Sequence, residues 1–521
     1  MAGLFAAQSN RGMVVSPHHQ ATEAGAQALR DGGSAADAII ATNAVLTVVY
    51  PHMCAIGGDI FVLGHTPAEG LFGLNGSGRA AALATVDWYR ARGLESIPSQ
   101  GPEAALTVPG CIDGWWTLHR RFGKLPWSRV LASAIEAAEG GFEVSPGLAE
   151  LGPSDLEGIL RSPQLTALFT LDGDFVPEGA VVKQPELAAT LRAIALGGPD
   201  AFYRGDIARR MSAAFEADGS PLRYADLAAH TTNWFEPLRV PYRGYEAAAL
   251  PPNTQGLVFL EAMRILEAFD VKSMGQRSPE LIHHQVEALK LAIADRNRWI
   301  GDEERSVGVA GRMLSEGHIE EQRSKVRATS GAQAVSGGGD TCYFCAVDGD
   351  GMALSCIESV YAGFGACYVA GDTGVIIQDR GASFNFKPGH PNELEPGRRP
   401  MHTLTPAMLL QDGKPRFVFG QMGGGAQPQF LTQIAQSFAD FGLDAPEAIA
   451  APRFTYGPLF VGEEGALTVE AGLAGAVAGL TARGHRVLDP LEEFSDNMGH
   501  ASGIHVRDDG MLVGGADQVR R

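Results

Sequence analysis

The chain has 521 residues, 45% of them hydrophobic and 19% charged, which is the balance of a globular protein with room for a large core. Its 41 basic and 60 acidic residues give a net charge of -19, which excludes nucleic acid as an expected partner, because phosphate binding needs clustered Lys and Arg. No apolar run approaches the roughly 20 residues that span a bilayer, and no signal peptide or disulfide scaffold is evident, so we expect a cytoplasmic protein with no membrane partner.

Helices dominate the expected structure of residues 1–340. Ser34 and Asp37 follow two glycines at the spacing of a capping box, which predicts a helix start at Ser34. Farther on, Ser278 precedes a proline, as an N-cap precedes the favoured first helical proline, and apolar residues recur at helical spacing from 282 to 293. We therefore predict helices that begin at these two points.

The pattern changes between residues 323 and 340. This segment, RSKVRATSGAQAVSGGGD, is small and polar with no periodicity, which predicts a mobile, exposed loop. Composition alone favours a domain linker, but unstructured loops of this length are uncommon inside compact domains and are usually functional. We expect residues 1–340 and 341–521 to be the two parts of the chain, with 323–340 as the mobile link.

Strands arranged as hairpins follow this loop. Two apolar runs flank Asp348–Gly351, and two more flank Asp412–Gly413, both of which are turn sequences. Helical patterns return near residues 428–441 and 473–484. Helices, then hairpins, then helices predict an α/β fold in which antiparallel sheets pack face to face with helices outside.

Thr341 stands where the loop enters the first of these strands. A Thr hydroxyl is a weak nucleophile unless a base removes its proton, and a Thr at a new N-terminus can use its own α-amine as that base. Such chemistry needs a cleavable bond before the Thr, a flexible segment to release and a rigid strand to hold the residue. The junction of Asp340 with Thr341, between a glycine run and a strand, offers all three. Threonines between a loop and a strand are common, so spacing alone is weak evidence of a nucleophile.

A glycine run at 423–425 follows the strand that ends near Gly420. Acyl transfer needs an oxyanion hole, which is often made of two backbone N–H groups where no side chain intrudes. These glycines could present such amides, or they could simply allow a tight strand-to-helix turn at positive φ. One turn of this kind can serve both purposes.

Metal, redox and dinucleotide sites are all disfavoured. Cys342 and Cys345 form a C-x-x-C, but residues three apart in a strand point to opposite faces and cannot readily share a metal. His283 and His284 are interpreted as surface or packing residues. Gly57–Gly58 precedes a strand instead of following one, which is the wrong context for a dinucleotide fingerprint. We expect no metal and no cofactor.

Several longer motifs occur in order along nearly the whole chain. They are GMVVSPHHQATEAGAQALRDGGSAADAIIATNAVLTVVYPHMCAIGGDIF, VPGCIDGWWTLHRRFGKLPW, YRGYEAAALPPNTQG, IADRNRWIGD, GDT, PGRRPMHTLTP, GQMGGG and APRF. With these motifs the chain resembles the γ-glutamyltransferase family of N-terminal-nucleophile (Ntn) hydrolases. The resemblance implies an αββα sandwich and a precursor that cuts itself before its nucleophilic Thr.

The resemblance also assigns roles to site residues. Carried over by position, the cut falls between Asp340 and Thr341, and Thr341 attacks the substrate carbonyl. Ser359 lies where the family usually has a second Thr that hydrogen-bonds the nucleophile, and Gly423 with Gly424 supplies the oxyanion-hole amides. The implied partners are a small-molecule amide and the two chains of one precursor as a heterodimer, with a dimer of these left open. Asp340 could assist or hinder the initial N-to-O acyl shift.

Departures from the family pattern fall at the positions that hold the glutamate of a γ-glutamyl donor. Ser77 or a neighbour takes the place of the family's Arg, with Arg79 displaced along the chain. The other changes are Tyr361 for an Asn, Arg380 for a Gln, Ser383 for an Asp, and His402–Thr403 for a pair of serines.

The changes at Arg380 and Ser383 alter the expected substrate. Losing the Asp removes the group that pairs with the glutamate ammonium, and Arg380 adds a positive charge that should reject a free α-amine. Arg also suits a bidentate contact with a carboxylate. We therefore expect an acyl group with a carboxylate and no amine. Within the family the chain is more similar to the amidases that include oxamate amidohydrolase and the cephalosporin (glutaryl) acylases.

Three hypotheses follow for the function. The first is a self-processed amidohydrolase that acts on an oxamate- or glutaryl-type amide through an acyl-enzyme on Thr341. The second is a γ-glutamyl transferase or hydrolase with glutathione-like donors, and the third is an uncleaved, non-catalytic ligand-binding homologue. Arg79 and Arg399 could be structural salt-bridge residues instead of substrate contacts. His402 could tune protonation or orient its loop, and His500 is expected near the pocket.

Overall fold

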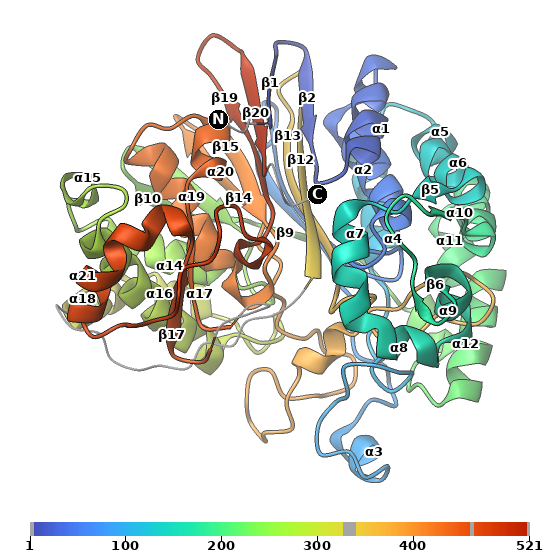
Figure 1. Cartoon of the computed structure of the whole chain (residues 1–521). Coiled ribbons are helices and arrows are strands. Elements are labelled where there is room, and N and C mark those ends of the chain that lie inside the picture. The colour runs from blue at the N-terminus through green and yellow to red at the C-terminus, as the bar shows by residue number, and fades with distance from the viewer. Residues whose placement is uncertain (1–4, 327–339, 459–462, 518–521) are drawn as a thin grey trace.

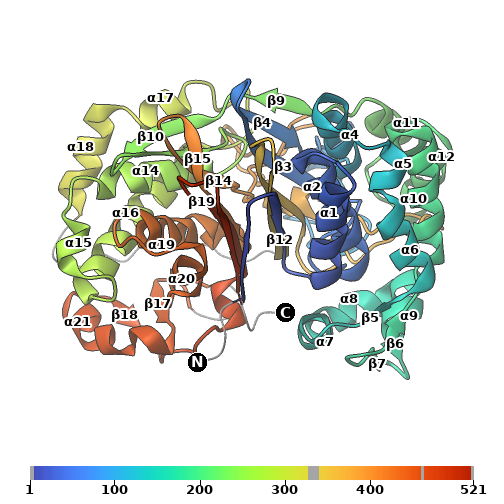
Figure 2. The ribbon, with the colours of Figure 1, turned by 90° about the horizontal axis from the view of Figure 1, so that it is seen from above.

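Two β-sheets stacked face to face between layers of helices form the centre of the molecule. The structure, a computed structural model of the chain, describes residues 5–326, 340–458 and 463–517. In Figure 1 the sheets stand together in the middle with helices on both sides, and Figure 2 shows the same order of layers from above. The predicted αββα sandwich is confirmed.

Each sheet is antiparallel and combines strands from both sides of residue 340. The larger sheet holds β1 (Phe5–Ser9), β10 (Leu238–Tyr242), β11 (Tyr245–Ala249), β14 (Ala407–Gln411), β15 (Lys414–Gln421), β19 (Ala501–Val506) and β20 (Leu512–Ala516). The smaller sheet holds β2 (Gly12–Val15), β3 (Asp59–Thr66), β4 (Gly70–Gly76), β9 (Asn233–Phe235), β12 (Asp340–Asp348) and β13 (Ala353–Tyr361). The strand orders are β1-β20-β19-β15-β14-β11-β10 and β2-β12-β13-β3-β4-β9. Cleavage before Thr341 would therefore leave two chains interleaved in both sheets.

Helices cover the outer face of each sheet. Beyond the smaller sheet lie α1 (His19–Arg30), α2 (Ala35–Val49) and α4 (Cys111–Phe122), and beyond the larger sheet lie α14 (Gly256–Leu266), α16 (Pro279–Trp299), α19 (Gln427–Ala439) and α20 (Ala445–Ala450) (Figure 1). Every residue of α2 is buried, as expected of a helix packed between a sheet and further helices. None of the helices among the described residues is both long and apolar enough to cross a membrane.

Further helices and short strands lie outside the two central sheets. The helices are α3 (Val86–Arg90), α5 (Trp127–Val130), α6 (Ala132–Gly140), α7 (Pro146–Leu151), α8 (Leu156–Arg161), α9 (Pro163–Phe169), α10 (Pro185–Gly197), α11 (Pro199–Tyr203), α12 (Asp206–Asp218), α13 (Tyr224–Ala228), α15 (Val271–Met274), α17 (Val309–Met313), α18 (Glu316–Lys325) and α21 (Val477–Ala482). Small strand groups are β5 (Phe142–Glu143) with β8 (Val181–Val182), β6 (Thr170–Leu171) with β7 (Asp174–Phe175), and β16 (Phe454–Tyr456) with β17 (Ala466–Val469) and β18 (Arg486–Val487).

Alternate side chains of each central strand divide between two cores. On β12, Tyr343 and Cys345 join the apolar layer between the sheets, whereas Cys342 and Phe344 join the layer beneath α1 and α2. The prediction that Cys342 and Cys345 point to opposite faces is confirmed. None of the six cysteines, all of which lie in the described ranges, is in a disulfide.

The expected helix starts and hairpins are confirmed. Ser34 Oγ accepts the Asp37 N–H at 3.3 Å while the Asp37 carboxylate accepts the Ser34 N–H at 2.8 Å, which is the predicted capping box of α2. Ser278 caps α16 by accepting the Leu281 N–H. The two predicted hairpins are β12–β13 and β14–β15.

The predicted loop over 323–340 is wrong at its start. Arg323 to Lys325 form the last turn of α18, which is held by a hydrogen bond from Arg323 to the Arg264 carbonyl and by its ion pairs with Glu316 and Glu320. Asp340 already belongs to β12. The rest of the prediction, over residues 327–339, lies outside the described residues.

Candidate functional site

The predicted nucleophile lies at an irregular end of β12. The register of β12 against β13 shifts between Asp340 and Cys342, as in a β-bulge, a feature that re-aims a side chain. Thr341 is 2% exposed, and its hydroxyl donates to the Ser359 hydroxyl oxygen at 3.2 Å. Ser359 Oγ also accepts the Tyr361 N–H at 2.8 Å. The structure thus brings together Thr341 and the residue expected to hydrogen-bond it.

Strand pleating aligns polar side chains at the end of the layer between the sheets. Ser359 follows Ile357 on β13 by two residues and lies opposite Asp59 of β3, so both share the face that carries the inter-sheet core. Thr341 reaches this face through its bond to Ser359. The site is therefore built from three adjacent strands, β12, β13 and β3, between the sheets.

The predicted oxyanion-hole glycines follow the end of β15. Gly423 has φ 135° and Gly424 has φ 49°, which are conformations that L side chains rarely adopt. They lead into a 3-10 turn, η3 (Gly424–Ala426), and then into α19, where unsatisfied backbone N–H groups favour negative charge. The turn therefore has the glycine conformation that the sequence suggested, and the role of its N–H groups in an oxyanion hole stays a prediction.

Two buried residues without an assigned role hold this glycine turn. Gln255 Nε2 donates to the carbonyl oxygens of Gly424 at 2.9 Å and Thr403 at 2.8 Å. Arg296 Nη1 donates to Gln255 Oε1 at 2.6 Å, and burial lowers the pKa of Arg296 to about 10. Gln255 thereby joins the turn to the segment around Thr403. Gln255 lies in the motif YRGYEAAALPPNTQG and Arg296 in IADRNRWIGD, both of which supported the family resemblance. Their place in these motifs was the only indication in the sequence that they belong near the site.

Arg380 is a buried cation with most of its donors unused. It begins a second 3-10 turn, η2 (Arg380–Ser383), is 1% exposed, and donates from Nη2 to Thr403 Oγ1 at 3.0 Å. Within the described residues, its Nε and Nη1 have no hydrogen-bond partner. The guanidinium carbon lies 3.9 Å from the centroid of the Tyr361 ring, and burial lowers the pKa of Arg380. Because the Tyr361 N–H binds Ser359, Arg380 is linked through one residue to the Thr341–Ser359 pair.

The backbone of Tyr361 supports a functional role for this corner. Its φ of 85° is one that non-glycine residues seldom adopt, and such strain is often found at active sites. The conformation occurs at the end of β13 and places the ring against the Arg380 guanidinium. Sequence reasoning placed Tyr361 at the site, but only the fold gives this stacking.

A buried acid–imidazole pair adjoins Arg380. Asp59 Oδ2 lies 3.2 Å from His402 Nε2, while Asp59 Oδ1 accepts the Gly78 N–H and a Gln378 Nε2 hydrogen. Burial raises the pKa of Asp59 to about 7 and lowers the pKa of His402 well below its ordinary value. Both pKa shifts favour the uncharged forms, a protonated Asp59 carboxyl group and a neutral His402 imidazole. Sequence reasoning missed Asp59, although it stands in the motif PHMCAIGGDIF.

The remaining residues of η2 are tied to their surroundings. Ser383 Oγ donates to the Met401 carbonyl at 3.1 Å. Asp379, directly before Arg380, is buried and accepts the Ala362 N–H at 3.0 Å, and burial raises its pKa to about 7. Arg380 therefore lies among carboxyl groups that are held toward their neutral forms.

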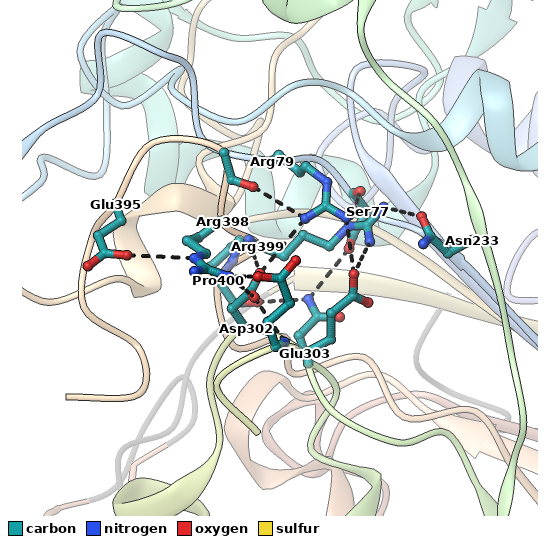
Figure 3. Close-up of polar contacts among 12 residues, drawn as sticks. Ser77, Arg79, Asn233, Asp302, Glu303, Glu395, Arg398, Arg399 and Pro400 are labelled. Carbon is teal, nitrogen blue, oxygen red and sulfur yellow. Dashed lines mark hydrogen bonds and ion pairs between the residues drawn. The ribbon is translucent and has the colours of Figure 1, made fainter. Parts of the chain in front are cut away.

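Arg79 and Arg399 belong to a separate polar network, drawn in Figure 3. Arg399 is 0% exposed and donates from all three guanidinium nitrogens, to two carbonyl oxygens, an amide oxygen and Glu303 at 3.1 Å. Arg79 donates to Glu303 at 3.0 Å and to the Gly397 carbonyl at 3.2 Å. These contacts favour the structural alternative for both arginines, and a contact of Arg79 with substrate stays a prediction.

His500 lies beside the glycine turn. Its carbonyl accepts the Met422 N–H at 3.0 Å, directly before Gly423. Its ring nitrogens lie 3.1 Å from Asp496 Oδ1 and 3.4 Å from the Tyr50 hydroxyl. The ring is thus held in place by partners outside the nucleophile's own strands.

His283, interpreted as a packing residue, is buried in a group of potential ligands. Its Nδ1 lies 2.8 Å from His485 Nε2, and the ligand atoms of His283, Glu287 and His485 all lie within 4.8 Å of one another. Lys290 donates to Glu287 at 2.9 Å, and an ammonium in this position opposes cation binding. His284 is half-buried, and its Nδ1 lies 2.8 Å from the Glu280 carbonyl oxygen.

A second group of this kind joins three helices. His318 of α18 lies 3.0 Å from Glu261 of α14 and 2.7 Å from Asp295 of α16. These carboxylates raise the pKa of His318, first through the hydrogen bond to Glu261. The contacts describe an ion-paired histidine that ties the three helices together.

Stacked antiparallel sheets between helices, with a buried Thr at the start of an inner strand and a hydroxyl acceptor beside it, define the architecture of an Ntn hydrolase. The sequence pattern of the family described as gamma-glutamyltranspeptidase matches residues 21–521. The chain belongs to this family, whose members are amidohydrolases and transpeptidases that act on C–N bonds. The expected family, fold and enzyme class are confirmed.

Individual relatives cover nearly the whole chain. The glutathione hydrolase-like YwrD proenzyme of Bacillus subtilis is 37% identical over 97% of this chain and 96% of its own length. The oxamate amidohydrolase proenzyme of Klebsiella pneumoniae is 36% identical over 98% and 97%. The crystal structure of cephalosporin acylase from Bacillus halodurans matches with a TM-score of 0.92 and 34% identity, over 99% of this chain and 95% of that one.

Proposed function

We propose that the chain is a precursor that cuts itself between Asp340 and Thr341, and that Thr341 then hydrolyses an amide whose small acyl group carries a carboxylate. The products, residues 1–340 and 341–521, would stay together because each contributes strands to both sheets. Two similar proteins named as an oxamate amidohydrolase and a cephalosporin acylase support amide hydrolysis. The six cysteines, none in a disulfide, suit the reducing cytoplasm that we propose as its location.

The buried guanidinium of Arg380 is the observation that supports this acyl group. An unbalanced buried cation destabilises a fold by several kcal/mol, so it persists where a ligand or a function requires it. Arg380 keeps two nitrogens without a partner in the described structure and lies against Tyr361, which binds Ser359. An acyl carboxylate on these nitrogens would form a charge-assisted contact beside the nucleophile.

The proposed chemistry uses Thr341 twice. During processing its hydroxyl attacks the Asp340 carbonyl carbon, the peptide nitrogen becomes the Thr341 α-amine, and water hydrolyses the resulting ester. During turnover that amine takes the hydroxyl proton, and Thr341 Oγ bonds to the substrate carbonyl carbon. The N–H groups of Gly423 and Gly424 stabilise the oxyanion. The substrate amine leaves with the proton, and water releases the acid from the acyl-enzyme.

A γ-glutamyl donor is less suited to this site. Its α-ammonium would lie near the Arg380 guanidinium, and like charges repel strongly where water is excluded. Asp59 and Asp379 are the nearby carboxyl groups, and burial holds both toward their neutral forms. At neutral pH they therefore carry only part of the negative charge that an ordinary carboxylate would offer to an ammonium.

The test has a processing arm and a substrate arm. Intact-mass measurement of the purified protein is expected to show two chains, whereas Thr341→Ala stays whole and inactive and Thr341→Ser keeps part of both activities. In the second arm, kcat/KM for oxamate or glutaryl-p-nitroanilide is expected to exceed that for γ-glutamyl-p-nitroanilide by at least about tenfold. A wild-type chain that stays whole, or faster turnover of the γ-glutamyl donor, contradicts the proposal.

A further inference from the structure

The carboxyl groups of Glu261 and Asp295 and the imidazole of His318, called here the His318 group, lie where three helices meet. Glu261 belongs to α14, Asp295 to α16 and His318 to α18. These helices pack against one another beyond the larger sheet (Figure 2). The proposed reaction uses none of the three side chains, so their arrangement needs another explanation.

Three potential metal ligands converge in the His318 group. His318 Nε2 lies 2.7 Å from Asp295 Oδ2 and 3.0 Å from Glu261 Oε1, and all three atoms lie within 4.8 Å of one another. In a tetrahedral zinc site, ligand atoms about 2.0–2.2 Å from the metal are about 3.3–3.6 Å apart. An outward movement of the side chains by roughly 0.5 Å would therefore make room for an ion of this size.

Hydrogen bonds alone do not satisfy the His318 group. The Nε2 atom of His318 carries at most one hydrogen, yet two carboxylate oxygens lie within hydrogen-bond distance of it, and Gln322 Nε2 is 3.2 Å away. Glu261 is 0% exposed, and its Oε2 has no hydrogen-bond partner among the described residues. A buried carboxylate oxygen without a partner destabilises the fold, whereas a cation between the carboxylates would contact it.

The His318 group also carries excess negative charge. Its two carboxylates face one imidazole, and in the described chain His318 is the only basic side chain that pairs with either of them. The basic side chains of the adjoining helices pair with other carboxylates: Arg264 with Glu267 and Glu316, Arg323 with Glu316 and Glu320, and Lys325 with Glu321. A divalent cation bound by two carboxylates and a neutral imidazole would leave no excess charge.

The second cluster of potential ligands, His283, Glu287 and His485, differs in this respect. Lys290 is 3% exposed and donates to Glu287 at 2.9 Å, so an ammonium already supplies positive charge there. A second cation would be repelled at this distance. The two clusters thus have similar ligand atoms, and their charge balance favours cation binding at the His318 group.

The exposure and chemistry of the ligands indicate which cation fits. The side chains of His318 and Asp295 are 13% and 11% exposed, which gives an ion a route from solvent, whereas that of Glu261 is 0% exposed. Imidazole with carboxylates suits Zn²⁺ and similar transition metals, whereas Mg²⁺ and Ca²⁺ prefer oxygen ligands alone. Water or the side-chain amide oxygen of Gln322 would supply a fourth ligand.

We propose that Glu261, Asp295 and His318 bind a divalent transition-metal cation of the Zn²⁺ type, which joins α18 to α14 and α16. The cation takes the place of the proton on His318 Nε2, since a metal ligand must be deprotonated. Local sequence motifs gave no sign of this site, because 23 and 57 residues separate His318 from Asp295 and Glu261. The inference is independent of the proposed substrate.

The first experiment measures metal binding to the whole protein. Chelator-treated, dialysed wild type is titrated with ZnCl₂ by calorimetry, and bound metal is counted after equilibrium dialysis. We expect one ion per chain at this site with a Kd of about 1 µM or less, and Kd values at least about a hundredfold higher for Mg²⁺ and Ca²⁺. No bound zinc at 10 µM, or equal affinity for Mg²⁺, overturns the proposal.

Substitutions then assign the ion to the His318 group. His318→Gln and Asp295→Asn each remove one ligand and are expected to raise the Kd for zinc at least about a hundredfold, because changes behind the ligands alone cost ten- to a hundredfold. His485→Gln, in the cluster that contains Lys290, is the matched control and should keep the wild-type Kd. Unchanged affinity in both ligand variants, or a loss in the control alone, contradicts the assignment.

Two further measurements separate this site from folding defects and from the nucleophile. In zinc-soaked wild-type crystals, an anomalous difference map at the zinc edge is expected to show a peak between α14, α16 and α18, and its absence overturns the proposal without any substitution. Thr341→Ala should bind zinc with the wild-type Kd. A loss of binding in that variant would place the ion at the nucleophile instead, and this result is separate from whether Thr341 cleaves the chain.

Discussion

Arg380 and Arg399 are both buried arginines of the same loop region, yet their surroundings differ completely. Arg399, 0% exposed, donates from every guanidinium nitrogen and ties together segments from before and after Thr341 (Figure 3). Arg380, 1% exposed, donates within the described residues to Thr403 and stacks on Tyr361. Of the two, Arg380 is the one that lies next to the nucleophile pair.

The difference separates an arginine whose donors are all used by the protein from one that we propose binds the substrate. A buried charge whose donors are all used holds its neighbours together, and its removal leaves them unpaired. A buried charge with unused donors destabilises the fold until something binds to it. Burial lowers the pKa of both arginines, so burial by itself does not distinguish them. Their hydrogen-bond partners do.

The largest expected effect is on catalysis by Arg380→Met. Removing the guanidinium should lower kcat/KM for acidic acyl amides by roughly a hundred- to a thousandfold, as expected when one partner of a buried charge pair is truncated. The free energy of unfolding should stay the same or rise, because an unsatisfied cation is lost. Steady-state kinetics test the expected loss of kcat/KM, and urea unfolding tests the expected free energy of unfolding. A stable variant with unchanged kcat/KM would remove Arg380 from the substrate site.

The reciprocal change, Arg399→Met, is expected to lower stability by about 3 kcal/mol, because Glu303 and the carbonyl acceptors lose their donor. Urea unfolding of the variant beside the wild type measures this. Arg399→Lys should recover only part of the loss, since one ammonium cannot replace the planar fork. In protein that folds, the ratio of kcat/KM for glutaryl and γ-glutamyl donors should stay the same; a changed ratio would assign Arg399 to the substrate site.

An effect of intermediate size is expected on KM as the pH changes, because carboxyl groups lie near Arg380. Burial raises the pKa of Asp59 and of Asp379 to about 7, while His402 stays neutral. Below pH 7 the two carboxyl groups are protonated and the Arg380 charge is unbalanced, which favours an anionic acyl group. Above pH 7 they become negative and offset that charge, so KM for acidic acyl amides should rise several-fold between pH 6 and 8. A neutral acyl amide, which lacks the carboxylate, should show no such rise.

The smallest effect is expected from the ring that stacks on Arg380. Tyr361→Leu removes the aromatic face 3.9 Å from the guanidinium, and KM for acidic amides should rise about two- to fivefold, in line with a cation–π contact of roughly 0.5–1 kcal/mol. Tyr361→Phe keeps the face and should behave like the wild type. If Leu and Phe give equal KM values, the ring contributes nothing to the position of Arg380.

Much of the fold could be predicted from local sequence patterns. The capping box at Ser34, the cap at Ser278 and the turn residues of the two hairpins are short-range signals, and all of them are found in the structure. The end of α18 was mispredicted, because contacts of Arg323 with a distant helix extend a segment whose composition resembles a loop. Periodicity detects which face of an element is buried, but it contains no information on such partners.

Only part of the candidate site could be predicted from local sequence patterns. The motifs pointed to Thr341, Ser359 and the glycine pair, and the structure brings Thr341 and Ser359 into hydrogen-bonding contact. Asp59 and Gln255 stood in the same motifs without a role, since their partners His402 and Thr403 lie more than a hundred residues away along the chain. Hydrogen bonds between distant segments leave no local pattern.

By itself the sequence determined the family, several helix starts and hairpins, and the identity of the expected nucleophile, because each depends on residues close together in the chain. The seven strands that the described part of residues 1–340 contributes to the two sheets were not predicted one by one. Only the tertiary structure decided which arginine has all its donors used and which does not. The physical reason is that burial, charge balance and free volume are properties of segments that meet in space. Arg380 and Arg399 are only 19 residues apart. Arg399 donates to Asn233 of β9 and to the carbonyl of Ser77, which follows β4, whereas Arg380 stacks on Tyr361 at the end of β13.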